Sequence, residues 1–272
     1  MKIKKFTILL SIIFSACAAG NSPVQLPSHI VQVTEGQSIL IHLNEGDVVV
    51  LGSKDRQVRV DGQTLFPYQT DYKVSSSKDQ IQIIANYAGS RSANTSIRLE
   101  VSVPNHVKLK VESEFASITI RDYEGELEAI SVSGDILVED VDGVIIARSN
   151  RGDVKVRDSK GRISVVGNYG PLTLENIHGD TGVSTIMGTI TFNGLILAGD
   201  AVRLETDHGP VAVNLNSDSA LDLQVRSNSG DVTCLLPGIA SSIRTCEGEF
   251  NSGDGALAIR TVSGAVTLQL IP

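Results

Sequence analysis

A glycine followed by alternating apolar residues recurs at a fixed spacing through the second half of the sequence. The spacing is 18 residues at first, and the phase slips by three residues twice, before Gly209 and before Gly230. A period of this length is typical of repeat proteins whose units stack on one another. The glycines that mark the copies are Gly134, Gly152, Gly170, Gly188, Gly209, Gly230, Gly248 and Gly264.

Each of the other positions in the repeat also keeps one type of residue from copy to copy. Apolar positions within a copy lie two residues apart, which places them on one face of a β-strand. A second glycine position separates two such strands, and we expect these turn glycines to adopt positive φ at little cost. These second glycines are Gly125, Gly143, Gly161 and Gly179. The inward position five residues before the first glycine holds Val111, Ala129, Ala147, Val165, Val183, Leu204, Val225, Ile243 and Ile259.

Stacking these copies about 4.8 Å apart would bury a continuous core and pair the backbone of each copy with its neighbours. We therefore predict an all-β protein with a β-solenoid of about nine two-stranded coils over residues 105–272. A β-sandwich of hairpins is the alternative. A sandwich, however, does not require nine copies of the same order of apolar, small and glycine positions. Residues 28–104 alternate without the repeat and predict an antiparallel N-terminal β cap that covers the open strand edge.

The N-terminus has the organisation of a bacterial export signal. A lysine-rich segment at residues 2–5 precedes an apolar segment at residues 6–14, and small residues follow before Cys17. The end of this segment resembles the bacterial lipobox. We expect residues 1–16 to be removed as a signal peptide, Cys17 to be acylated, and residues 17–27 to form a tether to the membrane of the cell envelope.

The charge of the mature chain limits its partners. Removing residues 1–16 takes away three of the 23 basic residues and none of the 31 acidic ones, so the net charge becomes 20 − 31 = −11. An acidic chain without basic clusters argues against binding nucleic acid and anionic membrane surfaces. No zinc-type histidine spacing, nucleophile elbow or phosphate loop occurs, so neither a metal nor a cofactor is expected.

Three sequence features carry a family resemblance. They are the segment Leu99-Glu-Val-Ser-Val-Pro, the segment Leu109-Lys-Val-Glu-Ser, and the repeated Ser-x-x-Gly-Asp-[Ile/Val] units. With them, the sequence from about residue 30 to residue 272 resembles the bacterial "putative adhesin" family, a domain of unknown function. The resemblance implies a β-solenoid and surface adhesion, and it brings no catalytic residues.

Two polar motifs lie within the repeat. Residues 151–153 spell Arg-Gly-Asp, an integrin-binding tripeptide, but its glycine and aspartate fill ordinary repeat positions and we interpret them as structural. A second set, just before the second glycine, is expected to hydrogen-bond its own turn. A ladder of bound cations is the alternative for that set. Its members are Asp122, Asp140, Asp158 and Asn176.

Cys234 and Cys246 would meet an oxidising compartment in an exported protein, which favours a disulfide between them. Cys234 falls in an inward position of one coil. Cys246 falls beside an inward position and is expected to face outward, which opposes the short distance that a disulfide requires. The sequence leaves both states open.

We predict a non-catalytic module that binds a protein or polysaccharide over a broad lateral face. The alternatives are a polysaccharide lyase-like solenoid enzyme and a scaffold for envelope assembly. The outward positions of the predicted face include Asp135, Asp153, Asp231, Glu249, Glu139, Arg157, Glu175 and Asn193. The irregular segments offer the enzyme alternative Asp200, Arg203, Asp218, Asp222 and Asp254.

Overall fold

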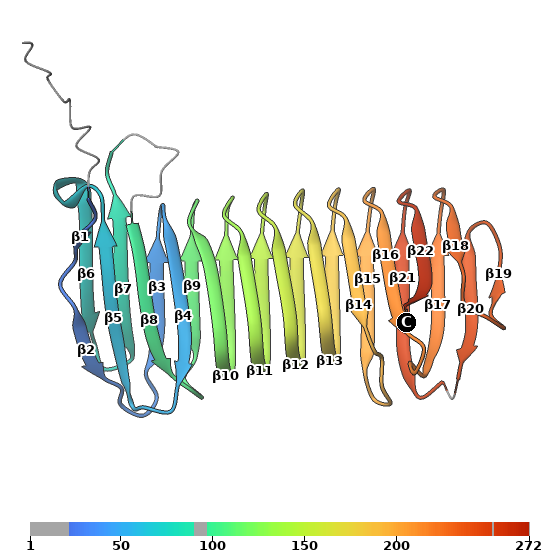
Figure 1. The fold of residues 1–272 in the computed structure, drawn as a ribbon, viewed down its shortest axis with the longest axis horizontal. Helices are drawn as coiled ribbons and strands as arrows, with labels where there is room; N and C mark the ends of the chain where they lie inside the picture. Colours follow the sequence, from blue (N-terminus) through green and yellow to red (C-terminus); the bar gives the residue numbers. More distant parts are fainter. Residues whose placement is uncertain (1–21, 90–96, 252, 272) are drawn as a thin grey trace, which may run out of the picture.

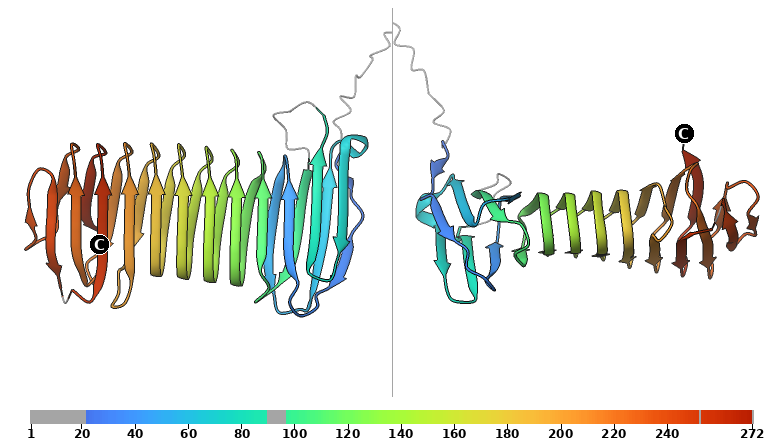
Figure 2. Two further views of the ribbon diagram at one scale, coloured as in Figure 1. Left: turned by 180° about the vertical axis from the view of Figure 1, so that it is seen from behind. Right: turned by 90° about the horizontal axis from the view of Figure 1, so that it is seen from below.

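The computed structural model describes residues 22–89, 97–251 and 253–271. Within them the chain forms β-strands, turns and one short 3-10 helix, η1 (Pro67–Gln69). The strands stack along one long axis, with a wider cap at the N-terminal end (Figures 1 and 2). The predicted all-β solenoid is therefore confirmed.

Four long, bent strands form the centre of the stack. Each pairs in parallel with the next at an offset of 18 residues, so that Ile118 lies opposite Ile136 and Ile136 opposite Val154. The part of each strand before the bend belongs to one face of the solenoid, named face 1 here, and the part after it belongs to face 2. Leu127, Ile145 and their equivalents point between the faces and are fully buried. These strands are β10 (Ser117–Ser131), β11 (Ile136–Ser149), β12 (Val154–Gly167) and β13 (Leu172–Thr185).

The first glycine column marks a close approach between coils. A Cβ on Gly152 would lie 2.1 Å from the carbonyl oxygen of Gly134, and a Cβ on Gly170 would lie 2.2 Å from that of Gly152. The turn before Gly152 is further held by Ser149, whose Oγ accepts the backbone N–H of Gly152 at 2.9 Å. A serine or threonine makes the same bond to Gly134, Gly188, Gly209, Gly230 and Gly264, whereas Gly167 occupies this position before Gly170. Positive φ belongs instead to the second column, whose four glycines have φ between 98° and 144°.

The N-terminal strands are not stacked in chain order. Strand β3 lies between β7 and β9, and β4 lies between β8 and β10, all in parallel. The antiparallel cap is formed by β5 against β8 and by β6 against β7, with β1 and β2 added to β5. Parallel coils therefore reach into residues 28–104, where the sequence predicted only a cap. The bounds are β1 (Val24–Gln25), β2 (His29–Gln32), β3 (Ser38–Leu43), β4 (Asp47–Ser53), β5 (Gln57–Thr64), β6 (Thr70–Ser76), β7 (Gln80–Tyr87), β8 (Ile97–Pro104) and β9 (Leu109–Ser113).

The C-terminal strands are inserted in a similar way. Strand β21 lies between β15 and β17, and β22 lies between β16 and β18, all in parallel. The last strands of the chain thus lie inside the stack (Figure 1). Strand β20 pairs antiparallel with β17 and closes this end together with β19. The bounds are β14 (Ile190–Gly194), β15 (Ala201–Thr206), β16 (Val211–Asn216), β17 (Leu221–Ser227), β18 (Val232–Cys234), β19 (Ala240–Ser241), β20 (Thr245–Phe250), β21 (Gly255–Thr261) and β22 (Val266–Ile271).

Two expectations for the C-terminal repeats are wrong. Gly248 was assigned to the stacking glycine column, but its nearest contact is the Ile239 side chain, and Gly264 stacks on Gly209 instead. Ile243 was assigned to the inward position, but 69% of it is exposed. Both errors have one cause: β20 runs antiparallel, so this segment has the spacing of a coil without forming one.

Candidate functional site

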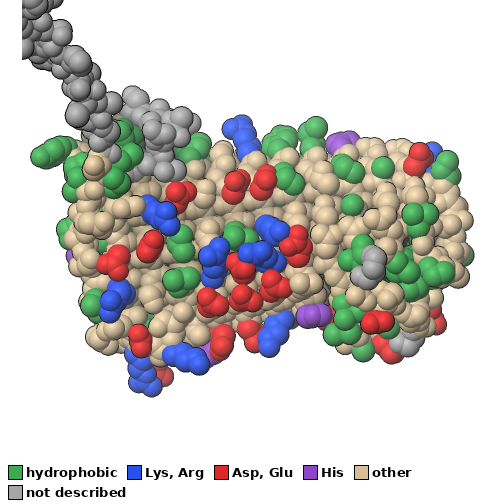
Figure 3. All heavy atoms as spheres, viewed as in Figure 1, with side chains coloured by type: hydrophobic (Ala, Val, Ile, Leu, Met, Phe, Trp, Pro, Cys, Tyr) green, Lys and Arg blue, Asp and Glu red, His purple; other side chains and the backbone are tan. Residues whose placement is uncertain are grey.

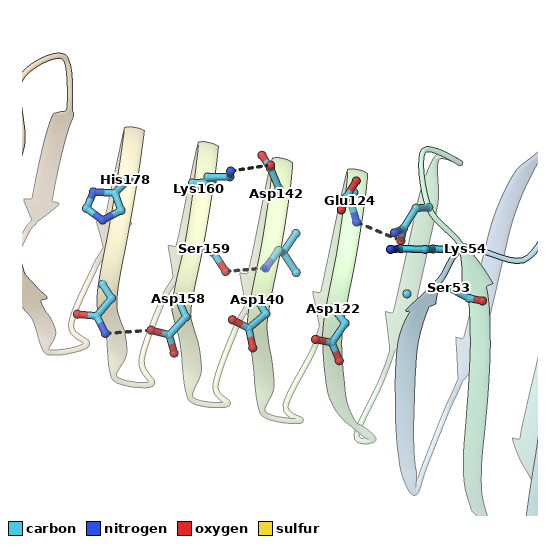
Figure 4. Close-up of a pocket in the computed structure, with 14 residues that line it drawn as sticks. Ser53, Lys54, Asp122, Glu124, Asp140, Asp142, Asp158, Ser159, Lys160 and His178 are labelled. Atoms are coloured by element: carbon cyan, nitrogen blue, oxygen red, sulfur yellow. Dashed lines mark hydrogen bonds and ion pairs between the residues drawn. The ribbon is translucent and has the colours of Figure 1, made fainter.

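A polar groove follows the bend between the two faces of the central coils. It has a volume of about 670 Å³ and is named the corner groove here. Figure 4 shows Asp122, Asp140 and Asp158 in a row, one from each of three successive coils. The groove is lined by Gly52, Ser53, Lys54, Asn105, Asp122, Glu124, Asp140, Val141, Asp142, Asp158, Ser159, Lys160, Asn176 and His178.

The row of aspartates is a product of backbone conformation. Asp122, Asp140, Asp158 and Asn176 have φ between 51° and 55°, a region that Asp and Asn enter more readily than other non-glycine residues. Their side chains are exposed, and Asn176 Nδ2 donates to Asp158 Oδ1 at 2.9 Å. Within the described residues, no group of three or more His, Cys, Asp or Glu side chains is arranged to hold a metal ion.

A second row of charges lies above the aspartates in the groove. The Lys160 ammonium lies 3.0 Å from an oxygen of Asp142, and His106 lies 3.6 Å from Glu124. Lys54 projects at the N-terminal end of the row (Figure 4). The corner groove therefore presents carboxylates and amines side by side, which suits a polar, hydrogen-bonding partner.

Face 1 beside the groove carries a network of ion pairs. Glu139 accepts from Arg121 at 2.9 Å and from Arg157 at 2.5 Å, one coil on each side. The hydrogen bond from Arg157 holds the pKa of the Glu139 carboxyl below its ordinary value. Lys155 and Glu175 form a further pair at 2.7 Å. The predicted outward positions at Glu139, Arg157 and Glu175 thus come together as neighbours that neutralise one another.

The character of face 1 changes along the axis. Beyond β13 the same outward column holds amides: Asn214 Nδ2 donates to Asn193 Oδ1 at 2.6 Å, and Gln269 Nε2 donates to Asn214 Oδ1 at 2.8 Å. Figure 3 shows charged side chains gathered over the central coils and few over this part. The sequence analysis included Asn193 but left out Asn214 and Gln269, although each lies five residues after a glycine of the first column, Gly209 and Gly264.

The Arg-Gly-Asp segment is built into the stack. Gly152 is buried in the glycine ladder, and the backbone N–H of Asp153 donates to Asp135 Oδ1 at 2.9 Å. Burial and the charge of Asp135 raise the pKa of Asp153. Two of the three residues therefore have structural roles, and Arg151 is exposed.

The residues considered for the enzyme alternative lie on different elements. Asp200 is buried and accepts backbone N–H groups from Gly179 at 2.7 Å and from Leu197 at 2.9 Å. Arg203 lies on face 2 and forms an exposed ion pair with Glu205. The carboxylate of Asp200 is thus used to hold the irregular loop against the preceding coil.

Cys234 and Cys246 are joined by a disulfide in the structure, with their Cα atoms 6.3 Å apart. The outward assignment of Cys246 is wrong, because Cys246 is fully buried. Cys246 is on the antiparallel strand β20 and lies opposite Val225 on β17. The alternation of inward and outward positions counted along the parallel coils therefore does not apply to it. Cys17, the predicted lipidation site, lies outside the described residues, as do residues 1–16.

Among the described residues, no helix has the length and apolar character needed to cross a bilayer.

The parallel ladders, glycine column and capped ends define a two-faced β-solenoid of the repeat-protein class. The family model described as Toastrack DUF4097 matches residues 36–269, and the chain belongs to this family. That match bears out the family resemblance found in the sequence. Among curated proteins, none matches this sequence.

Three solved structures from bacteria are similar over most of the chain. A Bacteroides fragilis protein named "putative adhesin" is 12% identical with a TM-score of 0.49, covering 93% of this chain and 98% of its own. A Parabacteroides distasonis protein of the same name is 7% identical with a TM-score of 0.40, covering 92% and 98%. A Clostridium sporogenes "putative cell adhesion protein" is 10% identical with a TM-score of 0.31, covering 92% and 99%.

Proposed function

We propose that the protein is a lipid-anchored, non-catalytic module of the bacterial cell envelope that binds a polysaccharide or protein partner. The binding surface is face 1 over the central coils together with the corner groove. Cys17 carries the lipid, and the solenoid extends the surface away from the anchor.

One observation carries this proposal: the groove and face 1 carry polar side chains at the same positions of successive coils, and the described residues include no convergent set of reactive groups. Catalysis requires such convergence in a concave, water-excluding site. A repeated row of carboxylates, amines and amides suits a partner that is itself extended, such as a polysaccharide chain or a protein surface. The buried role of Asp200 further supports a non-catalytic reading.

The binding proposal is tested by passing purified protein over immobilised acidic and neutral polysaccharides. We expect saturable retention that weakens at high salt, because charges in this groove are exposed and screened over about 8 Å at physiological ionic strength. On a neutral polysaccharide, whose hydroxyl groups would donate to these carboxylates, changing Asp140 and Asp158 together to Asn should weaken retention about tenfold, a loss of ~1.4 kcal/mol. Asp180→Asn on face 2 is the matched control and should leave retention unchanged.

The same assay separates binding from catalysis. Release of new reducing or unsaturated ends, abolished by changing Asp200, Arg203 or Asp218, would replace the binding module with the enzyme alternative. Equal retention of the Asp140/Asp158 variant and the control would reject the corner groove as the binding surface.

The anchor is tested separately by labelling cells with palmitate. Wild-type protein should incorporate the label and Cys17→Ser should not, because the acyl chain is attached through that residue. Equal incorporation in both, or none in either, would reject the lipid anchor.

A further inference from the structure

At one corner of the N-terminal cap, a fully exposed large aromatic side chain lies among described segments that contain no Asp, Glu, Lys or Arg. Tyr68, within η1, has 101% of its surface exposed, and Val24 beside it is 47% exposed. The residues between them form a shallow apolar notch of about 340 Å³. The N-terminal corner, as it is named here, consists of residues 22–25, 64–70 and 87–89.

These three segments lie together in space. Val24 pairs with Thr64, the backbone N–H of Ala88 donates to Gln69 O at 2.8 Å, and the rings of Phe66 and Tyr87 lie 5.4 Å apart. Figure 1 shows the loop before β6 at the same end of the molecule as β1. None of the segments contains Asp, Glu, Lys or Arg, whereas the mature chain as a whole has a net charge of −11.

The distance along the chain to the predicted anchor is short. Five residue steps separate Cys17 from Ser22. An extended chain spans at most ~3.6 Å per residue, so Ser22, the first residue of the corner, lies within about 18 Å of the acylated cysteine. The headgroup region of a bilayer is itself several ångströms thick on each side. The corner is therefore the part of the described structure that the anchor holds nearest to the lipid.

We infer that the N-terminal corner rests on the phospholipid bilayer and that Tyr68 enters its interfacial region. Tyrosine suits that position because its ring is apolar and its hydroxyl meets the wet headgroup layer. The absence of charge removes the cost of bringing acidic groups to an anionic surface. Contact at this corner would fix the orientation of the solenoid relative to the bilayer. It would therefore also fix the direction in which face 1 and the corner groove point. The inference rests on the lipid anchor of the proposed function.

The chain has no tryptophan, so a single introduced tryptophan reports on one position. We would prepare the full-length lipidated protein as Tyr68→Trp and as Ile243→Trp, and reconstitute each in phosphatidylethanolamine–phosphatidylglycerol vesicles with and without brominated acyl chains. Ile243 is 69% exposed and lies between β19 and β20, the strands at the opposite end of the stack (Figure 1), so it is the matched control. Circular dichroism checks that both variants are folded.

The introduced tryptophan at position 68 should emit at shorter wavelength on the vesicles and lose intensity with brominated lipid, whereas the one at position 243 should do neither. Flotation of each variant beside its Cys17→Ser form tests the anchor in the same sample. Flotation without quenching at position 68 rejects the membrane contact and leaves the anchor standing. Equal quenching at both positions also rejects the corner as the contact. Failure of the Cys17 protein to float rejects the anchor and the contact together.

Discussion

At Gly152 the backbone of one coil touches the carbonyl of the coil before it, and the absence of a side chain is what allows the contact. The same arrangement recurs at Gly134, Gly170 and Gly188, where an added Cβ would lie 2.0–2.2 Å from a carbonyl oxygen of the preceding coil. Gly182 differs: it lies in the same stack, but a Cβ there would have nothing within 4 Å. The two kinds of glycine can be separated by experiment.

We expect Gly152→Ala to lower the free energy of unfolding by about 1–3 kcal/mol, because a Cβ forces the two coils apart. Gly182→Ala should change it by no more than ~0.5 kcal/mol, since the site is open. Urea unfolding curves of both variants measure the difference. Equal loss in the two would show that the glycine ladder does not depend on close approach.

The inward column is tested at Val225, which is fully buried on β17. Val225→Asp places an unpaired carboxylate among apolar side chains and should unfold the protein, because burial of an isolated charge costs far more than a small domain can lose. Asn228→Asp lies three residues on, at an exposed turn position, and should be tolerated. Thermal unfolding monitored by circular dichroism tests this prediction. An equal shift of the unfolding midpoint in both variants would contradict the register.

At the level of elements, the inserted pair β21–β22 is the feature that most affects how the C-terminal end holds together. Each of its strands is paired on both sides, while the strands that precede it in the chain form the outer edge. The end of the chain is thus protected from fraying, and the antiparallel strand β20 covers the edge of β17.

Cysteine pairs test this order of strands. Glu205 on β15 lies opposite Arg260 on β21, and Arg226 on β17 lies opposite Arg260 from the other side. Neighbouring strands are ~4.8 Å apart and alternate strands ~9.6 Å. Cysteines at 205 and 260 should therefore cross-link on oxidation, and cysteines at 205 and 226 should not. Efficient cross-linking of the second pair would mean that the coils stack in chain order.

The bridge between Cys234 and Cys246 ties β18 to the antiparallel strand β20. We expect thiol titration of denatured, unreduced protein to find no free thiol at these two positions, because the two sulfur atoms are bonded in the structure and the proposed export would place the chain in an oxidising compartment. Reduction before titration is the control and should release two thiols. Two reactive thiols without reduction would exclude the bridge.

On the scale of the whole molecule, the central coils are interchangeable units between two caps. Strands β10, β11 and β12 pair in one unchanged register, each residue with the one 18 positions later. In such a stack each coil contacts only its neighbours, so stability is close to a sum of units and interfaces.

We therefore expect deletion of residues 136–153, one whole repeat, to leave a folded and cooperatively melting protein. Asp135 would then be followed directly by Val154, which follows an aspartate, Asp153, in the native chain as well. Strand β10 would pair with β12 in the native register. Deletion of residues 136–152 should fail, because a slip of one residue turns every inward side chain outward. Far-UV circular dichroism and thermal melts compare the two; equal folding of both would contradict register-dependent stacking.

Part of the candidate site could be predicted from the sequence. The positions of Glu139, Arg157 and Glu175 on one face follow from the repeat, because a fixed period and an alternation of two determine which side chains point outward. The corner groove could not be predicted, since its shape depends on the bend at residues such as Asp140 and on Lys54, which follows β4 and lies far from Asp140 in the sequence. Nor could the exposure of Tyr68, which follows from the packing of the cap.

The sequence by itself determined the β-solenoid and, over the central coils, its inward columns and its glycine ladder. These are local properties repeated at a fixed spacing, so one coil predicts the next. Only the tertiary structure decided the order of the coils at the two ends, the antiparallel path of β20 and the burial of Cys246. Those features depend on which strand fills an open edge, and spacing along the chain does not distinguish a coil that continues the stack from a segment that turns back and covers it.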